Sequence, residues 1–250
     1  MSRDEARVLV VGVGGLGAPL CLALAQAGVG TLGLLDDDVV ERTNLHRQIL
    51  FRDDDVGTSK IAAATGALGA AFPRLRIETH ETRLLPHNAV DLIARYDLVV
   101  EGSDNFATKF LTADACKIAA RPVVHGAAVR WVGTALAVSE EGGPCYRCLF
   151  EDLPRDHVPN CAEAGVVGPV VGLVGALQAD LALRLLDGLD GAHDVAGELV
   201  TVDGLAAPSR MVRRRRISRR RECSLCGETS SNGINEIERG RYVADVCAEG

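Results

Sequence analysis

Aromatic residues are scarce in this 250-residue chain, at 4% of the sequence, although hydrophobic residues make up 47%. A core of that size must be built mainly from Val, Leu, Ile and Ala. An excess of positive charge is also lacking, because the formal net charge is -7. That balance argues against a general nucleic-acid-binding protein. One basic run, RRRRISRRR at Arg213–Arg221, stands apart from it, and we interpret this run as a surface strand.

The sequence shows neither a signal peptide nor an apolar run of membrane-spanning length. Acidic residues precede the first apolar run, which leads directly into glycines. The most apolar stretch, Ala164–Leu177, is shorter than the roughly 20 residues that a spanning helix needs, and we expect it to form a buried helix that continues to Leu186. We therefore expect a cytoplasmic protein that binds no membrane. Eight cysteines in such a protein indicate metal binding or chemistry rather than disulfides.

Strands and helices are predicted to alternate along most of the chain. The first three are a strand at Val8–Val11, a helix at Ala18–Ala27 and a strand at Thr31–Leu35. Further helices are predicted over Ser59–Ala71, Asn88–Tyr96 and Phe106–Ala119, and further strands within Arg74–Leu84, Asp97–Asn105 and Arg121–Val138. The later segment GELVTVDGLAAPSRMVRRRR predicts antiparallel strands. We expect an α/β fold with a Rossmann-like, doubly wound, mostly parallel sheet and antiparallel C-terminal strands.

No internal repeat or low-complexity linker divides the chain. We therefore predict one domain over residues 1–227 and a polar, loosely ordered tail over 228–250.

A glycine-rich loop, GVGGLG at Gly12–Gly17, follows the first predicted strand and opens a helix. Such a loop lets the backbone approach a phosphate closely, and the helix N-terminus supplies N–H donors. The glycines of the candidate site are Gly12, Gly14, Gly15 and Gly17. Asp36 follows about 20 residues later, where a carboxylate accepts hydrogen bonds from ribose hydroxyls. These features suit an NAD-dependent oxidoreductase as well as an ATP-binding protein.

Four polar residues beyond Asp36 favour a triphosphate over a dinucleotide. Asn44 and Arg47 lie in the loop after the second strand, and Lys60 begins the next helix. Two cations directed at one pocket suit the charge of a triphosphate. Asp104 follows another strand, and a carboxylate beside phosphates is tolerated when it holds Mg²⁺. The alternative for Arg47 and Lys60 taken singly is ordinary surface charge.

Two C-x-x-C pairs, CYRC and CSLC, lie far apart in the sequence. Their four thiolates, from Cys145, Cys148, Cys223 and Cys226, would close a tetrahedral Zn²⁺ site with no open position. Such a site is structural and would hold the C-terminal segment against the domain. The alternative is a redox dithiol, which needs only one C-x-x-C motif.

Cys161 differs from the other cysteines because it lies in a polar loop just before the long apolar helix, close in sequence to Arg155 and His157. Those surroundings lower a thiol pKa and favour a nucleophile. A loop cysteine without a function is the alternative.

The order GVGGLG, LLDDDVVERTNLHRQ, SDN, CYRC, NCAEAGVVGP and CSLCG resembles the MoeB/ThiF/HesA group, the bacterial relatives of ubiquitin-activating enzymes. The resemblance covers roughly residues 7–228. It implies an adenylyltransferase that uses ATP to activate the C-terminal Gly-Gly carboxylate of a ubiquitin-like sulfur carrier, in thiamine, molybdopterin or related sulfur transfer. Matched positions imply that Asp36 binds ribose, that Asn44, Arg47 and Lys60 handle the phosphates, and that Asp104 holds Mg²⁺.

The resemblance also implies a homodimer and a loop cysteine, here Cys161, that engages the activated carrier in some relatives. No rhodanese domain follows in this sequence, so we expect the sulfur donor to be a separate protein. Two other functions stay open. One is an NAD-dependent oxidoreductase, and the other is a non-catalytic scaffold that binds a ubiquitin-like partner.

Overall fold

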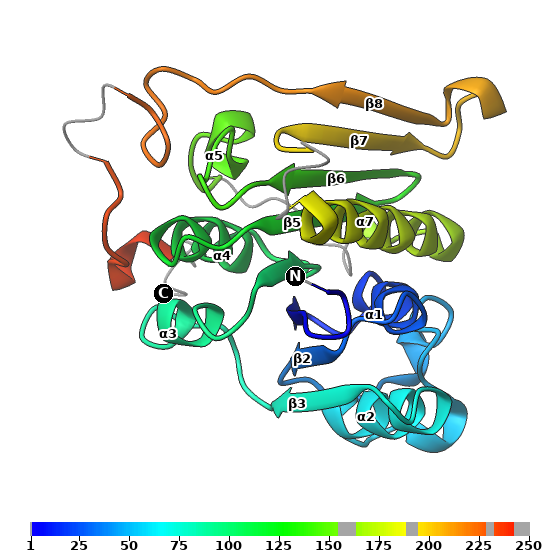
Figure 1. Cartoon of the computed structure of the whole chain (residues 1–250). Coiled ribbons are helices and arrows are strands. Elements are labelled where there is room, and N and C mark those ends of the chain that lie inside the picture. The colour runs from blue at the N-terminus through cyan, green and yellow to red at the C-terminus, as the bar shows by residue number, and fades with distance from the viewer. Residues whose placement is uncertain (1, 155–163, 189–194, 229–232, 243–250) are drawn as a thin grey trace, which may run out of the picture.

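A computed structural model describes residues 2–154, 164–188, 195–228 and 233–242 (Figure 1). Its single sheet has eight strands in the order β3-β2-β1-β4-β5-β6-β7-β8. The first five, which pair in parallel, are β1 (Arg7–Val11), β2 (Thr31–Leu35), β3 (Arg76–His80), β4 (Leu98–Glu101) and β5 (Val123–Val129). The last three, which are antiparallel, are β6 (Val132–Val138), β7 (Glu198–Asp203) and β8 (Val212–Arg216). The predicted fold class is confirmed.

Helices cover both faces of the sheet. They are α1 (Gly17–Gln26), α2 (Lys60–Ala71), α3 (Ala89–Ile93), α4 (Phe106–Ile118), α5 (Tyr146–Leu149) and α7 (Gly168–Gly188), with short 3-10 helices η1 (Arg42–Asn44), η2 (Asp53–Asp55), η3 (Pro208–Arg210) and η4 (Arg239–Tyr242). Alternate residues of β1 face opposite sides, as the period of a strand requires. Val8 and Val10 pack with α1, α2 and α7, whereas Leu9 and Val11 pack with α3, α4 and α5.

α7 is the one helix in the described part of the chain that is long and apolar enough to cross a membrane, but 56% of its most apolar window is buried inside the fold. It packs against α1, β5 and β6. Gly175 allows this close approach, because a Cβ there would lie 2.5 Å from the carbonyl oxygen of Leu16. The burial is that of a core helix.

α3 is shorter than predicted. It ends at Ile93, and Asp97 already donates its backbone N–H to the carbonyl oxygen of Arg7 at the start of β4. The chain must therefore leave the helix within a few residues to enter the sheet.

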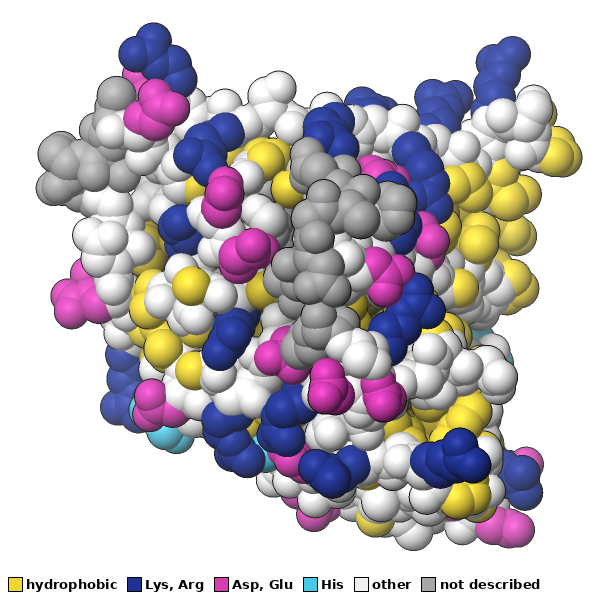
Figure 2. Space-filling view, viewed as in Figure 1, with side chains coloured by type: hydrophobic (Ala, Val, Ile, Leu, Met, Phe, Trp, Pro, Cys, Tyr) yellow, Lys and Arg dark blue, Asp and Glu magenta, His cyan; other side chains and the backbone are white. Residues whose placement is uncertain are grey.

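β8 forms one edge of the sheet and carries the first four residues of the basic run, Arg213–Arg216. All five of its residues are exposed. Figure 2 shows Lys and Arg side chains gathered along this edge. The interpretation of the run as a surface strand is confirmed for Arg213–Arg216, whereas residues 217–221 lie outside a strand.

Candidate nucleotide and metal sites

A cavity of about 510 Å³ opens at the carboxyl ends of β1, β2 and β4. The strand order reverses between β1 and β4, and ligands of open α/β sheets bind in the crevice at such a point. The volume lies within the range of small-molecule sites, which is about 300–1,000 Å³. Of the predicted site residues, the cavity wall includes Gly12, Gly14, Gly15, Asp36, Arg47, Lys60 and Asp104.

The glycine loop is built by close backbone contacts. Gly12 has a φ of +87°, a backbone conformation that residues other than glycine rarely adopt. A Cβ on Gly17 would lie 2.1 Å from the carbonyl oxygen of Gly12. Gly17 is therefore needed for the close packing within the turn, while Gly12, Gly14 and Gly15 line the cavity.

Asp36 ties the glycine loop to the end of β2. Its Oδ2 accepts a hydrogen bond from the Val13 backbone N–H at 2.8 Å, and its Oδ1 accepts one from the Asp38 backbone N–H at 3.0 Å. Burial raises the pKa of the carboxyl group, and the Lys60 ammonium together with these two donors offsets only part of that effect. The carboxylate still has lone pairs for ribose hydroxyls.

The two predicted cations are held by neighbouring polar groups. Lys60 Nζ lies 2.7 Å from Asp38 Oδ2 and 3.8 Å from Asp36 Oδ1. Arg47 donates from Nη2 to Asn44 Oδ1 at 2.5 Å. Asn44 is not part of the cavity wall as far as the structure describes it. It contacts Arg47, which does line the cavity.

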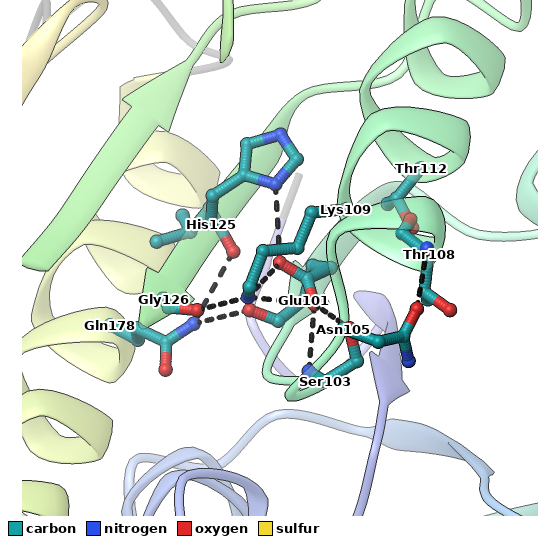
Figure 3. Close-up of polar contacts among 10 residues, drawn as sticks. Glu101, Ser103, Asn105, Thr108, Lys109, Thr112, His125, Gly126 and Gln178 are labelled. Atoms are coloured by element: carbon teal, nitrogen blue, oxygen red, sulfur yellow. Dashed lines mark hydrogen bonds and ion pairs between the residues drawn. The ribbon is translucent and has the colours of Figure 1, made fainter. Parts of the chain in front are cut away.

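The loop that carries Asp104 is held by a buried acid that the sequence reasoning missed. Glu101, at the end of β4, accepts from the Ser103 backbone N–H at 2.7 Å and from Ser103 Oγ at 2.5 Å (Figure 3). Lys109 Nζ lies 2.8 Å from Glu101 Oε2, and His125 Nδ1 lies 3.3 Å from the same oxygen.

Two effects oppose each other at Glu101. Burial acts to raise its pKa, but Lys109 and His125 outweigh burial, and the pKa is lowered. The sequence signal was an acid closing an apolar strand, followed by a lysine in the first turns of the next helix.

Gln48 and Tyr242 are two further residues of the cavity wall that were missed. Gln48 is 3% exposed, and its Oε1 has no hydrogen-bond partner among the described residues. A buried acceptor without a partner is costly, so this oxygen is suited to a ligand donor. Tyr242 comes from the predicted tail, in which Ile234 is buried as well. The division of the chain at residue 227 stays a prediction.

The four paired cysteines meet in space. The Sγ atoms of Cys145 and Cys223 lie 3.5 Å apart, and those of Cys148 and Cys226 lie 3.3 Å apart. All four sulfurs lie within 4.8 Å of one another. A tetrahedron with Zn–S bonds of about 2.3 Å has sulfurs about 3.8 Å apart, so the cluster is compatible with zinc.

The thiols already interact strongly. Hydrogen bonds among them lower the pKa of the Cys223 thiol, whereas the pKa values of the Cys145 and Cys226 thiols are raised. Zn²⁺ binds thiolates, so its binding would release the protons that these thiols share. The predicted nucleophile Cys161 lies outside the described residues.

Residues 3–225 match the ThiF family. "Adenylyltransferase and sulfurtransferase MOCS3" of Dictyostelium discoideum is 40% identical over 91% of this chain and 53% of its own length. The MOCS3 protein of Bos taurus is 44% identical over 97% of this chain and 53% of its own length. The chain thus spans about half the length of these relatives. "SAMP-activating enzyme E1" of Haloferax volcanii is 42% identical over 98% of this chain and 87% of its own length.

Solved structures share the fold at lower identity. E. coli MccB has a TM-score of 0.77 at 21% identity, covering 90% of this chain and 67% of that one. A crystal structure of MccB with ATP has a TM-score of 0.74 at 22% identity, covering 90% of this chain and 68% of that one. These likenesses support the assignment of the fold.

Proposed function

Because the chain belongs to the ThiF family, we propose that it is an ATP-dependent adenylyltransferase acting on the C-terminal Gly-Gly carboxylate of a ubiquitin-like sulfur carrier. The observation that carries the proposal is the arrangement of Arg47, Lys60 and Asp104 around one cavity with the glycine loop. The relatives named as an adenylyltransferase and as an activating enzyme support it. The carrier would belong to thiamine, molybdopterin or related sulfur transfer.

ATP would bind with its phosphates at the glycine loop and its ribose at Asp36. Lys60 would exchange its contact with the exposed carboxylate of Asp38 for a phosphate oxygen. Arg47, which also lines the cavity, would approach the phosphates in the orientation that Asn44 imposes on its guanidinium. A guanidinium held this way loses little freedom on binding, which favours a bidentate phosphate contact.

The reaction is a displacement at the α-phosphorus. A carboxylate oxygen of the carrier forms a bond to that atom, the bond to the bridging oxygen breaks, and pyrophosphate leaves with the electron pair. An acyl adenylate remains. The protein would act mainly by positioning the reactants and by stabilising the charge on the phosphate oxygens with Arg47 and Lys60.

Asp104 is the residue that would hold Mg²⁺, because it is an exposed oxygen ligand on the cavity wall. Bound Mg²⁺ supplies further charge neutralisation to the phosphates. A Zn²⁺ ion on Cys145, Cys148, Cys223 and Cys226 would be structural, since four thiolates leave no open position.

Three further parts of the proposal concern assembly. We propose that the protein is a cytoplasmic homodimer and receives sulfur from a separate donor protein. Cys161 is proposed to engage the activated carrier after adenylation. Adenylation should then survive Cys161→Ala, while sulfur transfer fails.

The deciding experiment is ATP–pyrophosphate exchange with a purified small carrier that ends in Gly-Gly. Exchange that depends on the carrier supports the proposal, and ATP binding without exchange would favour the scaffold. The oxidoreductase alternative predicts that NAD raises the melting temperature and that ATP with Mg²⁺ does not, because a ligand stabilises the state that binds it. Because Arg47 and Lys60 line the cavity, we expect ATP with Mg²⁺, and not NAD, to raise the melting temperature.

A further inference from the structure

The described end of the chain returns to the nucleotide cavity. η4 (Arg239–Tyr242) packs on α4, and its last residue, Tyr242, is 7% exposed and forms part of the cavity wall. The glycine loop, by contrast, lies near the start of the sequence. A segment of the C-terminal tail therefore completes a site whose other residues come from loops within the domain.

The hydroxyl group of Tyr242 is already engaged away from the cavity. It donates to Asp114 Oδ2 at 2.8 Å, and Asp114 is 0% exposed. Arg147 donates to the same carboxylate from Nε at 2.8 Å and from Nη2 at 2.9 Å. Since Arg147 stands between Cys145 and Cys148 in the sequence, this network connects the tail to the cysteine cluster. It fixes the aromatic ring, so the ring is what Tyr242 presents to a ligand.

The cavity wall has an apolar patch at Tyr242, bordered by polar residues of the same segments such as Arg83 and Thr108. Leu84, Leu111 and Tyr242 line the cavity and belong to one packed cluster on the α4 side of the sheet. Arg47 lies on the other side, where its stem and Val171 of α7 both approach Gly15. The cavity thus has an apolar patch with an aromatic ring on the α4 side and Arg47 on the other side, and Asp36 at the end of β2 also lines it.

A nucleotide has charged phosphates at one end and, at the other, a flat aromatic base whose faces pack against apolar groups. We propose that Tyr242 forms a wall of the nucleobase subsite, so that the tail contributes directly to nucleotide binding. This inference rests on the proposed function in one respect, namely that the cavity holds ATP. It goes further by assigning the base to the apolar side and by giving the tail a binding role.

Two ligands separate a contact with the base from a contact with the phosphates. We expect Tyr242→Ala to weaken ATP·Mg²⁺ binding about tenfold, or about 1.4 kcal/mol, as for loss of one aromatic contact with a base. Binding of inorganic tripolyphosphate with Mg²⁺ should change less than about twofold, because it has no base. Calorimetry on the full chain gives both values. Tyr242→Phe keeps the ring and should retain ATP affinity within about threefold.

Ile234→Ala is the matched control. Ile234 is a tail residue with the same 7% exposure and lies in the same packed cluster, but it is not part of the described cavity wall. It should leave the affinity for ATP within about twofold. If Ile234→Ala weakens ATP binding as much as Tyr242→Ala does, the effect is a general loosening of the tail, and the inference is wrong.

The remaining outcomes are also decisive. Unchanged ATP affinity in Tyr242→Ala would overturn the inference while leaving the proposed function intact. Equal losses for ATP and tripolyphosphate would overturn it as well, because the ring would then support the whole cavity. A wild-type protein that binds tripolyphosphate but gains nothing from the adenosine part would contradict both the inference and the choice of ATP as substrate.

Discussion

Two lysines of this protein have almost the same burial but different partners. The side chains of Lys60 and Lys109 are 8% and 6% exposed, and each pairs with an acid near the carboxyl end of a parallel strand. Lys60 bonds Asp38, whose side chain is 58% exposed. Lys109 bonds both carboxylate oxygens of Glu101, which is 0% exposed, and the carbonyl oxygen of Gly126. A buried ammonium is available to a substrate only if its present partner can return to water.

The carboxyl groups of Asp36 and Glu101, at the ends of these two strands, have pKa values shifted in opposite directions. The pKa of Asp36 is raised because burial outweighs the attraction of Lys60. At Glu101 burial is outweighed by Lys109 and His125, so its pKa is lowered. The charged form of Glu101 is therefore stabilised by the fold itself, whereas the charged form of Asp36 lacks full compensation without a ligand. This contrast distinguishes an acid that supports the site from an acid that is suited to ligand binding.

The largest effect is expected from Lys109→Met, which leaves the Glu101 charge buried without its ammonium partner. Breaking a buried pair in this way typically costs about 3–5 kcal/mol, so the free energy of unfolding should fall by that amount. Urea denaturation at neutral pH measures it. Adding Glu101→Gln to Lys109→Met should restore part of the loss, because the uncompensated charge is then removed.

Lys60→Met is the control for that comparison. It should lower the free energy of unfolding by less than Lys109→Met does, because Asp38 can be hydrated and the contact with the buried Asp36 is longer, at 3.8 Å. Equal losses for the two lysine variants would break the proposed contrast between a structural and an exchangeable ion pair.

The rate of ATP–pyrophosphate exchange should depend on the two cations at the cavity. Arg47→Ala and Lys60→Met are each expected to lower the rate of ATP–pyrophosphate exchange about 10²–10³-fold, because each removes charge stabilisation of the reacting phosphates. Zinc content and the melting temperature should stay close to those of the wild type, and metal analysis together with calorimetry checks this. Asn44→Ala should have a smaller effect, about tenfold, because Asn44 acts through Arg47. Exchange at the wild-type rate in Arg47→Ala would contradict the proposed site.

The sequence was sufficient for features that depend on neighbouring residues. The glycine loop and Asp36 belong to one strand–loop–helix–strand unit, so their spacing along the chain is enough to predict that they lie close together. The doubly wound, mostly parallel sheet was predicted from the alternation of strands and helices, whereas the strand order comes from the structure. The paired cysteines were also predictable, because four-thiolate sites are built from two such motifs.

Features that depend on distant contacts were missed. Asp114 and Tyr242 are 128 residues apart, and no local pattern marks either as a partner of the other. The phosphate contact that the resemblance implies for Asn44 stays a prediction, since its side chain donates to Glu41, accepts from Arg47 and is absent from the described cavity wall.

Acidification should weaken the structural pair of Glu101 and Lys109. A lowered pKa in the folded state means that the charged Glu101 contributes stability above its ordinary value of 4.5, and this stability is lost as the pH falls through the folded value. The free energy of unfolding should therefore fall below about pH 4.5 by up to about 1.4 kcal/mol per pH unit from this group. Urea titrations of wild type and Glu101→Gln isolate the effect. Parallel curves for the two proteins would contradict the assigned role of Glu101.

The smallest expected effect is a gain in stability from Asp36→Asn. Because the folded pKa of Asp36 is raised, its ionisation opposes folding once the pH exceeds its ordinary value of 3.8. The amide cannot ionise, and its oxygen can still accept from the backbone N–H of Val13. At pH 7 the free energy of unfolding should rise by about 0.5–1 kcal/mol, and the difference should vanish at about pH 3. ATP affinity should fall in the same variant, because the amide is a weaker acceptor for ribose hydroxyls than a carboxylate. A variant that is less stable than wild type at pH 7 would instead identify Asp36 as a structural acid like Glu101.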